Sequence, residues 1–291
     1  SDTVTRPCAD MRAAMAAAEV GDDCYGDDVT VARLEATLAE RTGKDAGLFF
    51  PTGCMSNLAA LLAHCPRGTE VITGRDYHVY ADEAGSPSVL GGLSLNPVPV
   101  APDGALEPHD IRAALKPEDQ HYARSQLLSL ENTVGGRAVP LTRMTEAADV
   151  ARDAGLAVHL DGARFFNAIA ALNCAHADLA SIADTVSLCL SKGSGAPAGT
   201  VLVGAEPVIA EARRARKLLG GGMRQSGVLA AAALWALDNV VPRLREDHER
   251  AMRLAQALAP MGAVRQATNM VFFTPSPDVA TRIGPRLAAR G

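Results

Sequence analysis

Lys192 is the residue of this sequence whose surroundings most favour nucleophilic chemistry. It follows an apolar segment, residues 185–190, whose pattern predicts a buried strand, and small residues follow it. A lysine amine that is partly removed from water loses its proton more easily and can attack a carbonyl carbon. The alternative is a solvated lysine at the end of a strand, because lysine is seldom buried.

Asp161 and Arg164 form a second candidate pair, just after a predicted strand at residues 156–160. A carboxylate at a strand end can face a heterocyclic nitrogen and keep it protonated, as a pyridinium electron sink requires. Arg164 would share the same side of the turn. The alternative is an aspartate that caps a helix, with the arginine as its ion-pair partner.

Gly53 and Cys54 lie in a turn between a predicted strand, residues 46–50, and a predicted helix. Glycine at a helix start lets backbone N–H groups and the positive end of the helix dipole hold a phosphate, although many such turns are purely structural.

His78 and His121 lie in turn-like sequence. An imidazole there could stack on a flat cofactor or move a proton, and the alternative is a structural histidine.

These candidates need a scaffold that brings them together. Short apolar segments alternate with helical segments, which predicts an α/β protein with a mainly parallel sheet. Ligands bind such sheets at the carboxyl ends of the strands. Polar residues that follow five predicted strands are therefore expected at one site: 52–54, 78–83, 131–132, 161–164 and 191–192. We also expect a large domain at residues 1–241 and a small C-terminal domain, begun by an amphipathic helix, at residues 242–291.

Composition limits the kinds of partner. The net charge is −5 and the basic residues are scattered, so neither a nucleic-acid surface nor a membrane-binding face is predicted, and a small-molecule ligand is expected. Six irregularly spaced cysteines, mostly among apolar neighbours, predict reduced, buried thiols in the cytoplasm, with no disulfides and no metal site. The longest apolar stretch, residues 228–237, is shorter than the roughly 20 residues of a membrane span. The chain starts without methionine and stops within a predicted helix, so we expect both ends to be trimmed.

Six segments, in this order, resemble the threonine aldolase branch of the fold-type I pyridoxal-phosphate enzymes over essentially the whole chain. They are Ser-Asp-Thr-Val-Thr-Arg-Pro at 1–7, Gly-Asp-Asp-Cys-Tyr-Gly-Asp-Asp at 21–28, Leu-Glu-Asn-Thr at 130–133, His-Leu-Asp-Gly-Ala-Arg at 159–164, Leu-Ser-Lys-Gly at 190–193 and Gly-Gly-Gly-Met-Arg-Gln at 220–225. The resemblance implies an aspartate-aminotransferase-like fold, with a mainly parallel seven-stranded sheet, helices on both faces and an incomplete small domain. It also implies pyridoxal 5′-phosphate and cleavage of L-threonine, L-allo-threonine and other β-hydroxy-α-amino acids to glycine and an aldehyde.

The same resemblance implies roles for matching residues. Lys192 would bind the cofactor covalently, Asp161 would pair with its pyridine nitrogen, and Arg164 would hold the ring hydroxyl or the substrate carboxylate. The catalytic base would be His78, which stacks on the ring, a second active-site histidine, His121, or a water that one of them holds. The other implied site residues are Gly53 and Cys54 for the phosphate, Ser1 for the substrate, and Tyr25 (substrate) and Arg224 (cofactor) near a subunit interface. Members of the family are usually homo-oligomers, commonly dimers of dimers.

Three departures from the family pattern qualify these roles. Cys54 stands where relatives usually have threonine, and Ser194 replaces a usual leucine. Relatives also continue beyond residue 291 and supply an arginine for the substrate carboxylate from that later segment. Two alternatives stay open: another enzyme on the same scaffold, such as an aminotransferase or a β-eliminating lyase, and a catalytically silent member that binds cofactor and serves as an interaction protein.

Overall fold

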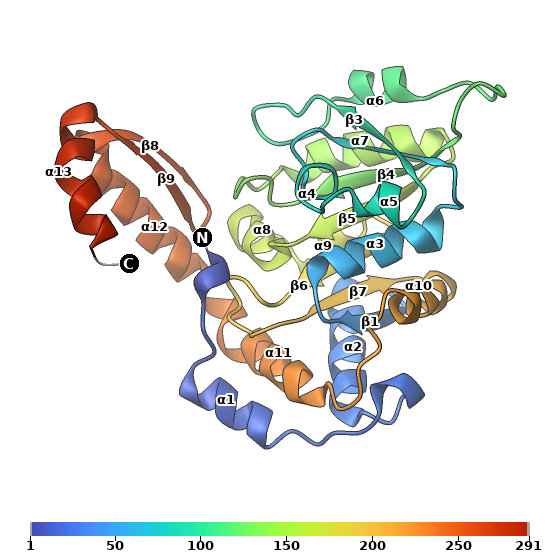
Figure 1. Cartoon of the computed structure of the whole chain (residues 1–291), viewed down its shortest axis with the longest axis horizontal. Helices are drawn as coiled ribbons and strands as arrows, with labels where there is room; N and C mark the ends of the chain where they lie inside the picture. Colours follow the sequence, from blue (N-terminus) through green and yellow to red (C-terminus); the bar gives the residue numbers. More distant parts are fainter. Residues whose placement is uncertain (1, 290–291) are drawn as a thin grey trace.

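The computed structural model describes residues 2–289, and its centre is one seven-stranded sheet (Figure 1). The strand order is β1-β7-β6-β5-β4-β2-β3, and only β7 runs antiparallel to its neighbours. The strands are β1 (Ala46–Phe50), β2 (Glu70–Gly74), β3 (Ser94–Val98), β4 (Ser125–Glu131), β5 (Ala157–Gly162), β6 (Thr185–Cys189) and β7 (Thr200–Gly204). The prediction of a mainly parallel seven-stranded sheet is confirmed.

Two details differ from the sequence prediction. β3 was not predicted, because it is a partly exposed edge strand that contains Pro97, and proline is tolerated at sheet edges but weakens a strand pattern. β5 continues to Gly162, so Asp161 lies within the strand and not just after it. The side chain of Asp161 is therefore held by backbone pairing with β4 and β6.

Helices cover both faces of the sheet. α3 and α10 pack together on one face, and α2, α7 and α11 enclose the main hydrophobic core on the other. The α-helices are α1 (Ala9–Ala16), α2 (Val29–Thr42), α3 (Gly53–His64), α4 (His78–Ala81), α5 (Ser86–Val89), α6 (Pro108–Ala114), α7 (Leu141–Asp153), α8 (Phe165–Leu172), α9 (His176–Ala180), α10 (Glu206–Leu218), α11 (Gly227–Asn239), α12 (Leu244–Leu258) and α13 (Pro277–Ala288). Short 3-10 helices are η1 (Asp2–Val4), η2 (Asp23–Tyr25), η3 (Val241–Arg243) and η4 (Ala259–Met261).

The alternation of side chains along β5 decides which residues face the ligand side. Val158 and Leu160 are fully buried in the main core, on the face covered by α7. Successive residues of a strand point to opposite faces, so His159 and Asp161 point toward α3. This face of the sheet therefore presents a histidine and a carboxylate to the helix.

The C-terminal elements stand apart from the large sheet. α12 leads to a separate antiparallel pair, β8 (Gly262–Ala267) and β9 (Met270–Pro275), and then to α13, which together project from the main body (Figure 1). η1, at the other end of the described chain, lies beside them, because Asp2 accepts a hydrogen bond from Asn269 at 3.1 Å. Segments from opposite ends of the sequence thus meet next to the sheet.

One helical segment, Gly227–Met261, is long and apolar enough to span a membrane by length and composition. It consists of α11, η3, α12 and η4. α11 packs against α1 and α2 in the core, and α12 carries acidic and basic residues along its length. We therefore assign α11 to the folded core.

All six cysteines are free thiols. The prediction of buried thiols is confirmed for Cys65 and Cys189 only, because Cys24 and Cys174 are half-buried and Cys8 and Cys54 are exposed. Cys54 is accessible because it lies in the first turn of α3, at the open end of the sheet.

Candidate active site

A cavity of about 310 Å³ opens at the carboxyl ends of β5 and β6, beside the first turn of α3. Five residues that the sequence singled out line it: Gly53, Cys54, His78, Asp161 and Lys192. Six further polar residues share its wall: Thr52, Asn57, Glu83, Ser187, Ser191 and Thr200. An amine, carboxylates and an imidazole therefore surround one space that can hold a small ring.

The first turn of α3 forms the end of this cavity that suits an anion. Thr52 caps the helix, since its hydroxyl accepts a hydrogen bond from Met55 N at 3.3 Å. Thr200 Oγ1 is buried and has no hydrogen-bond partner among residues 2–289, and a Cβ placed on Gly53 would lie 3.6 Å from it. A helix N-terminus beside an unpaired hydroxyl can bind a phosphate.

Asp161 is a buried carboxylate with two hydrogen-bond donors. Its Oδ2 accepts from Asn57 Nδ2 at 2.8 Å, and its Oδ1 accepts from Ala163 N at 2.9 Å. These donors offset the cost of removing the charge from water. Asp161 can therefore present negative charge to a cationic ring nitrogen in the cavity.

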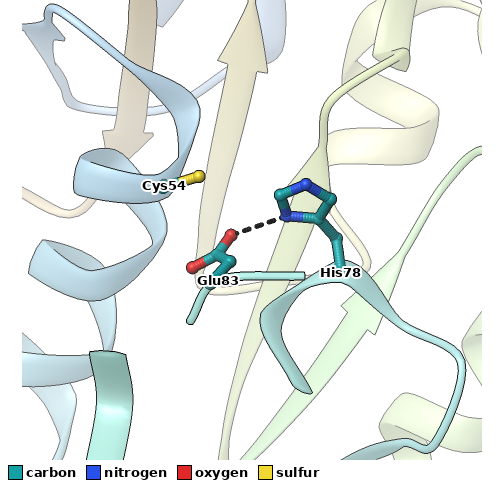
Figure 2. A group of neighbouring side chains, drawn as sticks. All are labelled: Cys54, His78 and Glu83. Carbon is teal, nitrogen blue, oxygen red and sulfur yellow. Dashed lines mark hydrogen bonds and ion pairs between the residues drawn. The ribbon is translucent and has the colours of Figure 1, made fainter. Parts of the chain in front are cut away.

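His78 is joined to Glu83 by a hydrogen bond of 2.9 Å between Nδ1 and Oε1, which Figure 2 shows. That hydrogen bond raises the pKa of His78 above its ordinary value, although burial acts against it. The backbone N–H of His78 donates to Glu131 Oε2 at 2.7 Å. Burial, and then the nearby charge of Asp161, raise the pKa of Glu131. His78 is thus a fixed imidazole that can hold or move a proton.

Asn57 connects these two carboxylates. Its Nδ2 also donates to Glu83 Oε1 at 2.8 Å, so one amide bridges Asp161 and Glu83. We call Asp161, Asn57, Glu83 and His78 the inner cluster. Three of its four members are buried, and each is held by at least one other member.

Cys54 lies next to this cluster and raises the question of a metal ion (Figure 2). One ligand atom from each of Cys54, His78 and Glu83 lies within 4.8 Å of the other two, so the three could hold a metal. Burial, and then the charges of Glu83 and Asp161, raise the pKa of Cys54 to about 11. A raised pKa disfavours the thiolate, the form in which a cysteine binds a metal.

Arg164 lies outside the cavity wall and pairs with Asp2. Its Nη2 donates to Asp2 Oδ1 at 2.8 Å and its Nε donates to Asp2 Oδ2 at 3.1 Å. Burial acts to raise the pKa of Asp2, but the hydrogen bond and charge of Arg164 bring the net pKa below its usual value. Asp2 also accepts from Asn269, so we call Asp2, Arg164 and Asn269 the outer bridge.

Besides Arg164, three predicted site residues that the structure describes do not line this cavity: His121, Tyr25 and Arg224. His121 precedes β4, a parallel strand, so it lies toward the amino edge of the sheet, whereas the cavity is at the carboxyl edge; its side chain is 73% exposed and bonded to Asp119. Tyr25 is exposed, and Arg224 is exposed and pairs with Asp22 at 3.0 Å. Ser1 lies outside the described residues.

Asn57, Glu83 and His159 were not predicted as individual site residues. Asn57 is four residues after Gly53, so the two share one face of α3, and this spacing is a signal that could have found it. His159 is two residues before Asp161, which places both on one face of β5. Glu83 lies in the 78–83 segment that was expected at the site, but nothing in its spacing indicates its hydrogen bond to His78.

Comparison with known proteins agrees with this geometry. The sequence pattern of the beta-eliminating lyases matches residues 1–276. The low specificity L-threonine aldolase of Escherichia coli (strain K12) is 48% identical over 292 residues, covering 100% of this chain and 88% of that protein. An alanine racemase, TOXG, of Cochliobolus carbonum is 38% identical over 241 residues, 81% of this chain and 61% of that one. The structure of Leishmania major threonine aldolase has the same fold, with a TM-score of 0.85, 22% identity, and coverage of 98% of this chain and 86% of that one. The chain belongs to the beta-eliminating lyase family.

Proposed function

We propose that this protein is a pyridoxal-phosphate-dependent, low-specificity L-threonine aldolase. It would cleave L-threonine, L-allo-threonine and other β-hydroxy-α-amino acids to glycine and an aldehyde. The observation that carries the proposal is the convergence of Lys192, Asp161 and His78 on one cavity at the carboxyl edge of the sheet. The 48% identity to the E. coli aldolase over the whole chain supports this activity.

The cavity residues fit pyridoxal phosphate. Among residues 2–289, Lys192 is the one lysine on the wall, and it would attach the cofactor covalently. The start of α3 and the unpaired hydroxyl of Thr200 would hold the phosphate, and Asp161 would meet the ring nitrogen. When bound, the cofactor supplies an electron sink for a bond broken at the substrate α-carbon.

The protein's own groups would orient the substrate and move its protons. His78, or a water that it holds, would take the proton of the β-hydroxyl as the Cα–Cβ bond breaks and the aldehyde carbonyl forms. A proton returned to Cα then gives glycine. His78 is preferred to His121 because it lines the cavity. Arg164 would hold the substrate carboxylate or the ring hydroxyl.

The direct test is to incubate the purified protein with pyridoxal phosphate and L-threonine, and to measure acetaldehyde and glycine. Equal amounts of both products are expected. A protein that binds the cofactor, with its visible absorption band, but forms neither product would contradict the proposal and favour the silent family member.

One observation favours a second candidate, an amino-acid racemase, namely the relationship to an alanine racemase at 38% identity. A racemase returns a proton to the opposite face of Cα and leaves Cα–Cβ intact. Chiral chromatography of alanine incubated with the enzyme separates the two activities. The same incubations detect an aminotransferase by a keto acid, and a β-eliminating lyase by ammonia with pyruvate.

Three further features complete the proposal. The exposed Tyr25 and Arg224 and the family resemblance support a homo-oligomer built as a dimer of dimers, with these residues near a subunit interface. Six free thiols support a cytoplasmic location. The separate β8–β9 pair supports a domain division at residues 241 and 242.

A further inference from the structure

A line of polar side chains leads from the inner cluster to the opposite edge of the sheet. Asn57 Oδ1 lies 3.2 Å from His159 Nε2, and His159 Nδ1 lies 3.0 Å from Thr185 Oγ1. Thr185 Oγ1 lies 3.1 Å from His64 Nε2, near a second cavity that His64 lines at the amino edge. His159 and Thr185 are fully buried, and neither lines the cavity of the proposed active site.

The two N–H groups of Asn57 decide where the protons in this line lie. Both donate to carboxylates, one to Asp161 and one to Glu83, so the carbonyl oxygen faces His159. A carbonyl oxygen only accepts, and His159 Nε2 must therefore carry a proton. Burial lowers the pKa of His159 to about 3, so the ring is neutral and its Nδ1 accepts from the Thr185 hydroxyl.

We propose that His159 is a positioning residue for the proposed reaction. Its Nε2–H holds the carbonyl oxygen of Asn57, which keeps both Asn57 N–H groups on the carboxylates of Asp161 and Glu83. If the Asn57 amide turned over, its oxygen would face two carboxylates and its NH₂ group would face the Nε2–H of His159. Both contacts are repulsive, and the buried surroundings strengthen the repulsion.

Thr185 and His64 hold His159 in turn. The single hydroxyl proton of Thr185 goes to His159 Nδ1, so the Thr185 oxygen accepts from His64 Nε2–H. All hydrogen bonds then point from His64 toward the cavity. The influence on the carboxylates should decrease from His159 to Thr185 to His64, because each step adds a side chain that can relax.

The inference rests on the proposed function, since Asp161 matters here as the group that meets the cofactor ring. The test is a titration of the cofactor-free protein with pyridoxal phosphate. His159→Phe keeps a flat ring of similar size and removes both nitrogen atoms. The dissociation constant of this variant for pyridoxal phosphate should rise about 10- to 100-fold, the range observed when a residue that holds a ligating group is removed.

A double-mutant cycle separates positioning from general structural damage. If His159 acts through Asn57, His159→Phe should change the dissociation constant less than about twofold in an Asn57→Ala background. An equal factor in both backgrounds, or an unchanged constant in the single variant, would overturn the proposal. The readout is cofactor binding, so a protein without aldolase activity could still give either result. Failure of this inference is therefore distinguishable from failure of the proposed function.

Two measurements cover the case in which His159→Phe does not fold. Thr185→Val is nearly isosteric and should weaken cofactor binding less than His159→Phe, whereas His64→Phe should leave it close to the wild-type value. If these residues had a merely structural role, the variants would instead lower the melting temperature, and their effects on cofactor binding would not follow this order. NMR of protein labelled with ¹⁵N at histidine should show the His159 proton on Nε2, and a proton on Nδ1 would contradict the proposal.

Discussion

The inner cluster and the outer bridge are both built from charged groups, but they are constructed differently. The inner cluster is anchored to the large sheet and the elements packed on it, and Asp161 sits within a strand paired on both sides. The outer bridge joins η1, the residue before α8, and the turn between β8 and β9, which are far apart in sequence. We infer that the inner cluster fixes the chemistry, and that the outer bridge tunes substrate binding where separate segments meet.

The largest effect is expected from Lys192→Ala. Without its amine the cavity has no lysine to attach the cofactor, so activity should fall to background and the visible absorption band should be lost. Lys217→Ala, at an exposed position of α10, is the matched control and should keep both. Borohydride reduction followed by peptide mass mapping would place the cofactor; a different modified lysine in the wild-type protein would refute the assignment.

Asp161→Asn tests the role of the inner cluster in the chemistry. It removes the charge that faces the ring nitrogen and places an amide against the Asn57 amide, so kcat should fall roughly 100- to 1000-fold, as when one preorganised electrostatic contact is lost. KM should change much less. The measurement is steady-state kinetics, and Asp178→Asn, on an exposed face of α9, is the control variant.

Arg164→Lys tests the role of the outer bridge in substrate binding. Lysine keeps the charge but loses the two-pronged contact with Asp2, so KM for threonine should rise about tenfold, the scale of one charged hydrogen bond, with a smaller change in kcat. Arg152→Lys, a half-exposed site on α7, is the control. If kcat instead fell as far as in Asp161→Asn, the division between the two regions would be wrong.

His78 gives the inner cluster a pH dependence. Its pKa in the folded protein is above the ordinary 6.5, so its ion pair with Glu83 stabilises the fold fully below about pH 6.5 and loses that contribution as pH rises through the folded pKa. His78→Asn keeps a donor near the position of Nδ1 but does not titrate. In urea unfolding of the cofactor-free protein, the wild-type advantage over this variant should shrink from pH 5.5 to pH 8.5; a constant difference would contradict it.

The smallest effect is expected from Cys54→Thr. It places a hydroxyl, a better donor than a thiol, in the first turn of α3, where the phosphate would lie. The dissociation constant of pyridoxal phosphate should fall about two- to tenfold, the scale of one net hydrogen bond. Cys8→Thr, at the exposed cap of α1, should leave cofactor binding unchanged.

The sequence predicted features that depend on neighbouring residues. Apolar segments predicted the strand that ends just before Asp161 and the strand that precedes Lys192, and the rule that ligands bind at the carboxyl edge grouped Gly53, Cys54 and His78 with them. The hydrogen bonds of the inner cluster could not be predicted, because Asn57 and Asp161 are 104 residues apart and meet only when α3 packs on the sheet.

The outer bridge shows the same limit. Arg164 was expected to contact a ligand, but its partner in the structure, Asp2, lies 162 residues away. His121 was expected at the site from its turn-like sequence and the resemblance, and local sequence does not reveal at which edge of the sheet a turn lies. Direction along a parallel sheet is a property of the assembled fold.

The antiparallel course of β7 has a consequence for protein engineering. The short connection that carries Lys192 returns at once into the sheet, and Leu190 N bonds Gly199 O at 3.0 Å across it. Gly199, in this connection, has a φ of 114°, and a Cβ there would lie 2.5 Å from the Phe49 ring. The length and the composition of the connection are therefore both constrained. Attempts to enlarge the pocket for bulkier aldehydes should leave this hairpin intact and redesign the surrounding walls.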